Sequence, residues 1–168
     1  MKLVLETPRL RLRPLTPDDA PFIFELLNDP SWIRFIGDRQ IRTLDDARGC
    51  ITAKVIAMYE RHGVGSLLTE LKATGEPLGI CGLIKREGLE DMDIGFAFLP
   101  RYWAKGYAYE AAKACMDHGR GVLGLKRIVA INSTDNESSA RLLEKLGLKF
   151  ERTVSLPNDP EELRLYAA

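Results

Sequence analysis

The residues whose types and spacing could do chemistry lie between positions 93 and 110, in the run DIGFAFLPRYWAKGYAYE. We expect a strand over residues 91–99 and a helix that begins near Lys105, joined by a short loop of small residues. A strand that leads into a helix in this way exposes unpaired backbone N–H groups, which suit a phosphate or diphosphate. Gly106 would let the backbone approach such an anion, and Arg101 and Lys105 add positive charge beside it.

The same segment has a second interpretation, in which it is a plain connection and its glycine serves only for packing. Spacing alone does not decide between the two. The loop lacks the pattern G-x-x-x-x-G-K-[ST], which argues against a P-loop nucleotide site. No G-x-G-x-x-G follows the first expected strand, which argues against a dinucleotide-binding fold.

The elements that must position this segment follow from hydrophobic periodicity and from turn residues. Strands are expected at residues 9–15, 65–71, 78–85, 91–99, 127–132, 149–154 and 162–167. Helices are expected from Thr16 to about Asn28, from Thr43 to about Gly63, from Lys105 to about Gly119 and from Asn136 to Leu146, whereas residues 31–42 look irregular. This order predicts a mixed α/β fold, a mostly antiparallel sheet of about seven strands flanked by about four helices, in one domain over residues 1–168.

The composition is that of an ordinary globular protein, with 24 basic and 24 acidic side chains. Because there is no basic excess, we expect neither nucleic acid nor a membrane surface as a partner. Cys50, Cys81 and Cys115 lie among apolar neighbours without metal-ligand spacing, so we expect free thiols, no metal and a reducing compartment. No signal peptide or membrane-length apolar run is evident, so a cytoplasmic protein is expected. Its oligomeric state, monomer or homodimer, stays open.

Three motifs stand in order along the chain: the opening ETPRLRLRPLTPDDA, the loop WAKGYAYEA, and the stretch from Asn136 through EKLGLKF. Together they resemble the GNAT superfamily of N-acetyltransferases, and its RimJ/RimL-like branch in particular. In the loop, Gly106-Tyr107-Ala108 matches the end of the family's pyrophosphate pattern, and Trp103 stands where Gln or Arg is usual. The resemblance covers nearly the whole chain and implies an acetyl-CoA-dependent N-acetyltransferase that acts on a primary amine.

The resemblance also implies where acetyl-CoA would bind. In GNAT enzymes the strand before the loop and the strand after the helix splay apart, and the pantetheine arm lies in the gap. Backbone groups near Phe96 and Phe98 would then contact the pantetheine amides. Backbone N–H groups of Lys105, Gly106, Tyr107 and Ala108 would cradle the pyrophosphate. Arg101, Trp103 and Ala104 would also belong to the cofactor site. Asn136 would contact the pantetheine region, a role compatible with capping its helix.

Direct attack of an amine on the thioester needs a base, because the amine is mostly ammonium at neutral pH. By the same resemblance, Asp93 is the first candidate base and Glu110 the second, although an orienting role fits Glu110 equally well. Many relatives use a tyrosine on the last helix to protonate the leaving thiolate, but Leu143 matches that position. Ser139 is therefore the candidate donor to the CoA sulfur; alternatively, it bonds to the backbone carbonyl four residues earlier.

The acceptor cleft is implied around residues 28–42, which include Trp32, Arg34 and Phe35. The alternative for Trp32 and Phe35 is a small core under a loop. The branch includes enzymes that acetylate ribosomal-protein N-termini and others that act on small amines, so the acceptor stays open. Because the tyrosine acid is missing, a second hypothesis is a CoA-binding sensor or interaction module without turnover.

Overall fold

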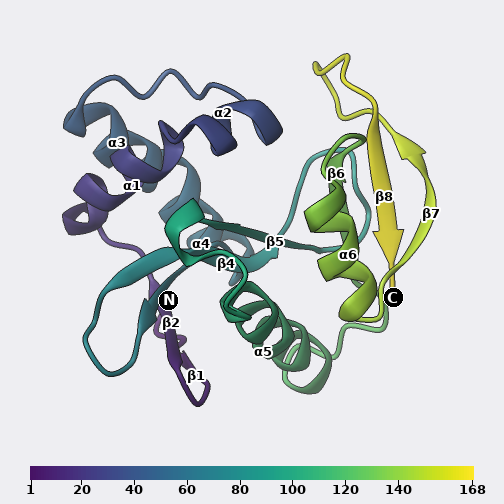
Figure 1. Ribbon diagram of the computed structural model, residues 1–168, viewed down its shortest axis with the longest axis horizontal. Coiled ribbons are helices and arrows are strands. Elements are labelled where there is room, and N and C mark those ends of the chain that lie inside the picture. The colour runs from purple at the N-terminus through teal and green to yellow at the C-terminus, as the bar shows by residue number, and fades with distance from the viewer.

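The fold is known from a computed structural model that describes residues 1–168. Its centre is one open sheet of eight strands in the order β1-β2-β3-β4-β5-β6-β8-β7 (Figure 1). The strands are β1 (Leu5–Glu6), β2 (Leu10–Pro14), β3 (Leu67–Leu71), β4 (Pro77–Ile84), β5 (Asp93–Phe98), β6 (Val129–Ser133), β7 (Lys149–Val154) and β8 (Leu163–Ala167). Only β5 and β6 run parallel, so the predicted mixed and mostly antiparallel class is confirmed.

The sheet has one strand more than the seven expected. The additional strand, β1, is two residues long and pairs antiparallel with β2, Leu5 opposite Leu12 and Glu6 opposite Arg11. A two-residue strand has no alternation long enough to be recognised in a sequence.

Five helical segments accompany the sheet, one more than expected. They are α1 (Ala20–Leu27), α2 (Pro30–Phe35), α3 (Leu44–Cys50) with its continuation α4 (Ala57–His62), α5 (Tyr107–Gly121) and α6 (Glu137–Lys145). Short 3₁₀ turns cover Pro17–Asp19 and Pro100–Tyr102. Thr16 and Thr43 form the predicted N-terminal caps, each within a capping box. None of the helices has the length and apolar composition of a membrane-spanning segment.

The prediction that residues 31–42 are irregular is wrong for their first part, where α2 forms. The Asp29 carboxylate accepts a hydrogen bond from the Ser31 N–H at 2.9 Å, and Pro30 occupies the first helical turn. The triplet Asn28-Asp29-Pro30 therefore ends one helix and begins the next. A second departure is Ile51–Ile56, which joins α3 to α4 as a π-helix.

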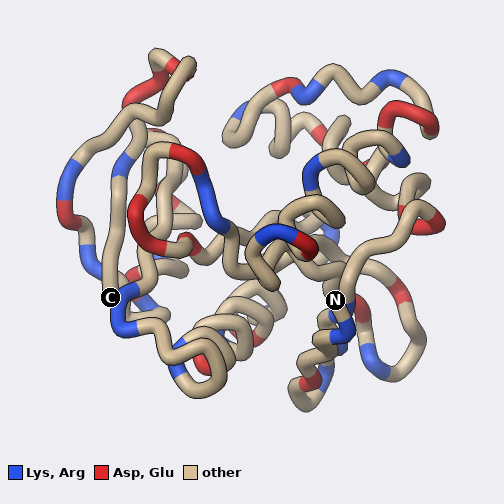
Figure 2. The backbone as a smooth tube through the Cα atoms, turned by 180° about the vertical axis from the view of Figure 1, so that it is seen from behind, with Lys and Arg blue, Asp and Glu red and all other residues tan.

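The main core is a cluster of 31 buried residues between the sheet and its helices. Figure 1 shows β5 running between two groups of elements: α1, α2 and α3 on one side, and α6 with β6 and β8 on the other. Basic and acidic positions are interspersed along the backbone (Figure 2). The middle of β5 therefore lies between these two groups.

Candidate active site

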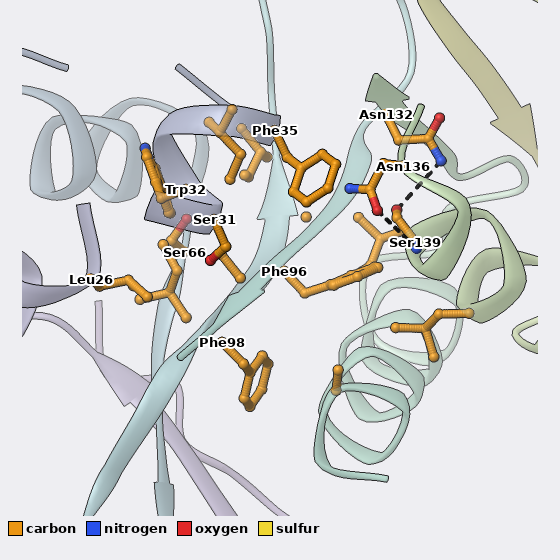
Figure 3. Close-up of a pocket in the computed structure, with 18 of the residues that line it drawn as sticks. Leu26, Ser31, Trp32, Phe35, Ser66, Phe96, Phe98, Asn132, Asn136 and Ser139 are labelled. Atoms are coloured by element: carbon orange, nitrogen blue, oxygen red, sulfur yellow. Dashed lines mark hydrogen bonds between the residues drawn. The ribbon is translucent and has the colours of Figure 1, made fainter. Parts of the chain in front are cut away.

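A cavity of about 790 Å³ follows β5, and this volume is within the range of small-molecule sites. Figure 3 shows Trp32 and Phe35 from α2 on one side of Phe96, with Asn136 and Ser139 from α6 on the other. Of its 40 lining residues, 26 are hydrophobic, so only a few polar side chains in the cavity are available to bind or react with a ligand.

The gap opens because β5 and β6 pair at a single position, Asp93 with Val129. There the Val129 N–H donates to the Met92 carbonyl at 3.1 Å, after which the two strands separate. Backbone groups of alternate residues point to the same side of a strand. Those of Phe96, beyond this single pairing position, therefore point toward β6 with no strand to pair with. This is the splayed strand pair that the sequence resemblance implies.

The end of β5 is closed by Trp103. Its indole N–H donates to the Phe98 carbonyl at 2.8 Å, while 47% of the residue stays exposed. This bond occupies the carbonyl of Phe98 and leaves its N–H as the group available to a ligand. Trp103 lines the cavity as well, at the point where the loop toward α5 begins.

The start of α5 presents a row of free backbone donors. The N–H groups of residues 104–109 donate to no backbone carbonyl, and the first helical bond comes from Glu110 to the Gly106 carbonyl at 3.1 Å. Ala104 and Gly106 have φ of 61° and 81°, which turns the loop so that consecutive N–H groups converge. Because α5 is 15 residues long, its dipole adds to these donors. This site fits a diphosphate.

Arg9, the residue before β2, anchors the loop and does not line the cavity. Its guanidinium donates to the Lys105 carbonyl at 2.9 Å and to Glu110 at 2.8 Å, and it stacks over the Tyr107 ring at 4.5 Å. Thr7 donates a short hydrogen bond to the same Glu110 carboxylate. Glu110 thus links the N-terminal strands to α5 and does not line the cavity.

Burial raises the pKa of Glu110, but the hydrogen bonds from Thr7 and Arg9 outweigh it and hold the pKa below its ordinary value. A lowered folded-state pKa stabilises the fold above the ordinary pKa, and this contribution is lost as the pH falls through the folded-state value. We therefore expect Glu110→Gln to cost about 1–3 kcal/mol at pH 7, or several degrees of melting temperature. The difference from the wild type should shrink as the pH falls through the lowered pKa of Glu110, because the protonated carboxyl no longer carries the charge that Thr7 and Arg9 stabilise.

The matched control for this variant is Asp117→Asn on the same helix, which removes an exposed pair with Lys113 and should cost under about 0.5 kcal/mol. Melting curves between acidic and neutral pH measure both. A variant Glu110→Gln that melts like the wild type and yet loses about a hundredfold in kcat/KM would contradict the structural role and make Glu110 a base.

Asp93 is 1% exposed and lines the cavity at the point where the strands separate. Its Oδ2 accepts from the Arg86 Nε at 2.8 Å, while its Oδ1 is buried without a partner. Burial raises the pKa of the Asp93 carboxyl above its usual value, and the guanidinium of Arg86 opposes this shift only in part. A carboxylate with a raised pKa and a free oxygen is suited to accept a proton.

A second group of polar side chains lines the same cavity, at the end of β6 and the start of α6. The Asn136 side chain caps α6 by accepting from the Ser139 N–H at 3.2 Å. The Ser139 hydroxyl is 3.4 Å from the amide nitrogen of Asn132, whose oxygen faces Arg164 at 3.4 Å. Because Ser139 accepts from Asn132 and makes no bond to the carbonyl four residues earlier, its own proton is free.

Most of the site residues predicted from the sequence line the cavity, and a few lie outside it. Those that line the cavity are Trp32, Phe35, Asp93, Phe96, Phe98, Trp103, Ala104, Gly106, Tyr107, Ala108, Asn136 and Ser139. Side chains that lie elsewhere are Arg34, which faces Asp135 at 3.7 Å, and Arg101, which pairs with Glu25 at 2.9 Å. Lys105 is also outside the lining, although its N–H belongs to the row at the start of α5.

Residues 9–149 match the acetyltransferase (GNAT) domain family. The chain belongs to the GNAT family of acetyltransferases. It is 34% identical over 166 residues to YkkB, an uncharacterized protein of Bacillus subtilis. The matched region covers 95% of this chain and 92% of YkkB. It is 26% identical to the spermidine N(1)-acetyltransferase of Escherichia coli K12, over 84% of this chain and 74% of that enzyme.

Solved GNAT structures share the whole fold. An acetyltransferase from Agrobacterium tumefaciens superimposes with a TM-score of 0.84 at 28% identity, covering 100% of this chain and 95% of that one. RimL, a ribosomal L7/L12 α-N-protein acetyltransferase in complex with coenzyme A, gives a TM-score of 0.83 at 16% identity, over 99% of this chain and 97% of that one. At 16% identity the second likeness concerns the fold alone. The chain is thus an acyltransferase of the GNAT fold, a family that uses acetyl-CoA.

Several residues at the GNAT cavity carry no obvious signal in the sequence. Arg86 lies in the turn after β4, and Asn132 and Ser133 end the buried strand β6. A polar pair that directly follows an apolar strand is the kind of signal that could have identified the last two. Lys54 belongs to the π-helix, whose geometry is not readable from apolar spacing.

Proposed function

We propose that this GNAT enzyme transfers the acetyl group of acetyl-CoA to a primary amine in the cavity beside β5. The observation that carries the proposal is the row of unpaired N–H groups at residues 104–109, which opens onto a cavity along the free side of β5. Such a row suits the diphosphate of CoA. The unpaired backbone of β5 suits the amides of the pantetheine arm, because it offers donors and acceptors in strand geometry.

In this proposal the loop holds the pyrophosphate by its backbone, at Ala104, Lys105, Gly106, Tyr107 and Ala108. The pantetheine arm lies along β5, against the backbone of Phe96 and the N–H of Phe98. Trp103 covers the arm where β5 ends, and Asn136 approaches it from α6. Arg101 acts at longer range, because its guanidinium is engaged by Glu25.

The reaction is direct attack of the amine nitrogen on the thioester carbonyl carbon. Asp93 takes a proton from the amine, directly or through water, which its raised pKa and free Oδ1 favour. A backbone N–H on the free side of β5 stabilises the oxyanion. The C–S bond then breaks as the attacking nitrogen loses its remaining extra proton, which passes to the leaving thiolate, directly or through water, to give the amide and CoA thiol. The Ser139 hydroxyl donates a hydrogen bond to this sulfur. Leu143 is buried at 1% exposure and has no polar atom to offer.

The acceptor is a primary amine, either the α-amine of a protein N-terminus or a small molecule. Relatives named for each kind exist, the spermidine enzyme and RimL among them. We place the chain in the RimJ/RimL-like branch, as a single cytoplasmic domain, on the strength of the opening motif ETPRLRLRPLTPDDA and the stretch from Asn136.

The proposal is tested by measuring CoA release from acetyl-CoA across peptide N-termini, polyamines and small amines. An enzyme that works by direct attack releases CoA only when an accepted amine is present. Binding of acetyl-CoA without release with any amine would favour a CoA-binding sensor instead.

A further inference from the structure

The cavity wall carries more positive than negative side chains. Four cationic side chains line the cavity, Arg39, Lys54, Arg86 and Lys145, against one carboxylate, Asp93. That carboxylate is already paired with Arg86 at 2.8 Å. A cation that enters the cavity therefore meets a single carboxylate, which it shares with Arg86, whereas an anion meets several positive groups.

Two of these cations lie on the acceptor side. Arg39 follows α2, and Lys54 lies in the π-helix between α3 and α4. Figure 1 shows α2 and α3 on the opposite side of β5 from α6. Neither forms an ion pair within the chain. Lys145 differs, because it stacks over the ring of Tyr109 near the start of α5, on the side that the proposed function assigns to CoA.

The rest of the acceptor wall is mostly apolar and aromatic, with the hydroxyls of Ser31 and Ser66 as its polar groups. Trp32 and Phe35 of α2 face the cavity, and Ile51, Val55 and Met58 line it from the π-helical segment and α4. π-Helical turns occur mostly as local insertions at functional sites. Here the π-helix coincides with a cavity wall that combines apolar side chains with an unpaired lysine.

We infer that the acceptor is an amine with an apolar or aromatic body and a carboxylate, and that polyamines are poor substrates; this rests on the proposed function. The body packs against Trp32 and Phe35 while the amine points toward Asp93. The carboxylate lies toward Lys54 and Arg39, whose charges would repel a second ammonium. In this respect the chain differs from its relative named for spermidine.

Matched acceptors separate charge from shape. Para-aminomethylbenzoate and para-aminomethylbenzamide share one body and one amine and differ in a single negative charge. We expect kcat/KM to be about fivefold higher for the benzoate, as for a partly exposed ion pair, and lowest of all for spermidine. The preference should shrink as ionic strength rises, because salt screens charges at the mouth of the cavity.

The double variant Arg39→Met with Lys54→Met should remove the preference for the benzoate and improve spermidine. Lys126→Met is the control, since Lys126 is exposed, unpaired and outside the cavity. An N-terminal phenylalanyl peptide, compared with free phenylalanine, shows whether the carboxylate belongs to a free amino acid or to a longer chain.

Binding of the same acceptors to the protein–CoA complex by calorimetry separates the two possible failures. Preferred binding of the benzoate without any turnover would support the inference about charge and contradict the proposed function. Acetylation of spermidine at least as efficiently as of the benzoate would overturn the inference while leaving acetyl transfer intact. An unchanged preference in the double variant would also overturn it.

Discussion

Gly106→Glu is expected to weaken acetyl-CoA binding by at least about a hundredfold, or about 2.7 kcal/mol, in a chain that still folds. Gly106 has φ of 81° at the N-terminus of α5, in the middle of the free N–H row of residues 104–109. A Cβ there meets the Arg9 guanidinium at 3.2 Å, so a side chain displaces the residue that anchors the loop, and a carboxylate adds negative charge beside the donors. The left-handed backbone costs a non-glycine residue about 1–2 kcal/mol, which a domain of this size should tolerate.

The matched control is Gly121→Glu at the other end of the same helix. A side chain at Gly121 meets nothing within 4 Å, so it adds the same charge without touching the cavity. Calorimetric titration with acetyl-CoA, together with melting curves, measures both variants. If Gly106→Glu binds acetyl-CoA as tightly as Gly121→Glu does, the pyrophosphate is held elsewhere.

Asp93→Asn is expected to lower kcat/KM by at least about a hundredfold at pH 7 with little change in affinity for acetyl-CoA. The carboxylate is buried at the mouth of the strand gap with one free oxygen, and its raised pKa makes it a better proton acceptor than an exposed aspartate. Asparagine keeps the shape but accepts no proton. The loss should shrink at high pH, where more of the acceptor is free amine.

The control for Asp93→Asn is Asp91→Asn, just before the same strand, which removes an exposed pair with Arg127 at 3.0 Å outside the cavity. It should leave kcat/KM unchanged. Steady-state rates between pH 6 and 10, with melting temperatures for each variant, distinguish a base from a structural ion pair with Arg86. An Asp93→Asn enzyme that loses stability yet keeps more than about a third of its rate would show that another base, or bulk water, takes the proton.

The features that could be predicted from the sequence are those set by residues close together in the chain. The alternation of RLRLRPL predicted β2, and Thr16 and Thr43 marked helix starts because capping depends on residues a few positions apart. The loop before α5 was recognisable for the same reason, since its free N–H groups follow from one strand, one turn and one helix.

What the sequence could not predict was set by contacts between distant residues. Glu110 is held by Arg9, about a hundred positions earlier, so nothing near Glu110 distinguishes a base from a structural anchor. The Asp93–Arg86 pair depends on the antiparallel turn between β4 and β5. The π-helix at Ile51–Ile56 has the apolar spacing of an ordinary helix. The sequence therefore did not indicate that Lys54 lines the cavity.

The most direct test of acetyl transfer in this cavity is to count CoA released and amine acetylated by the wild-type protein in the same reaction. Thiol release and mass spectrometry of the amine give the two numbers. One acetylated amine for each CoA, with no release when the amine is omitted, is the result expected for direct attack. Tight binding of acetyl-CoA with no amine-dependent release, across the whole panel of amines, would contradict it.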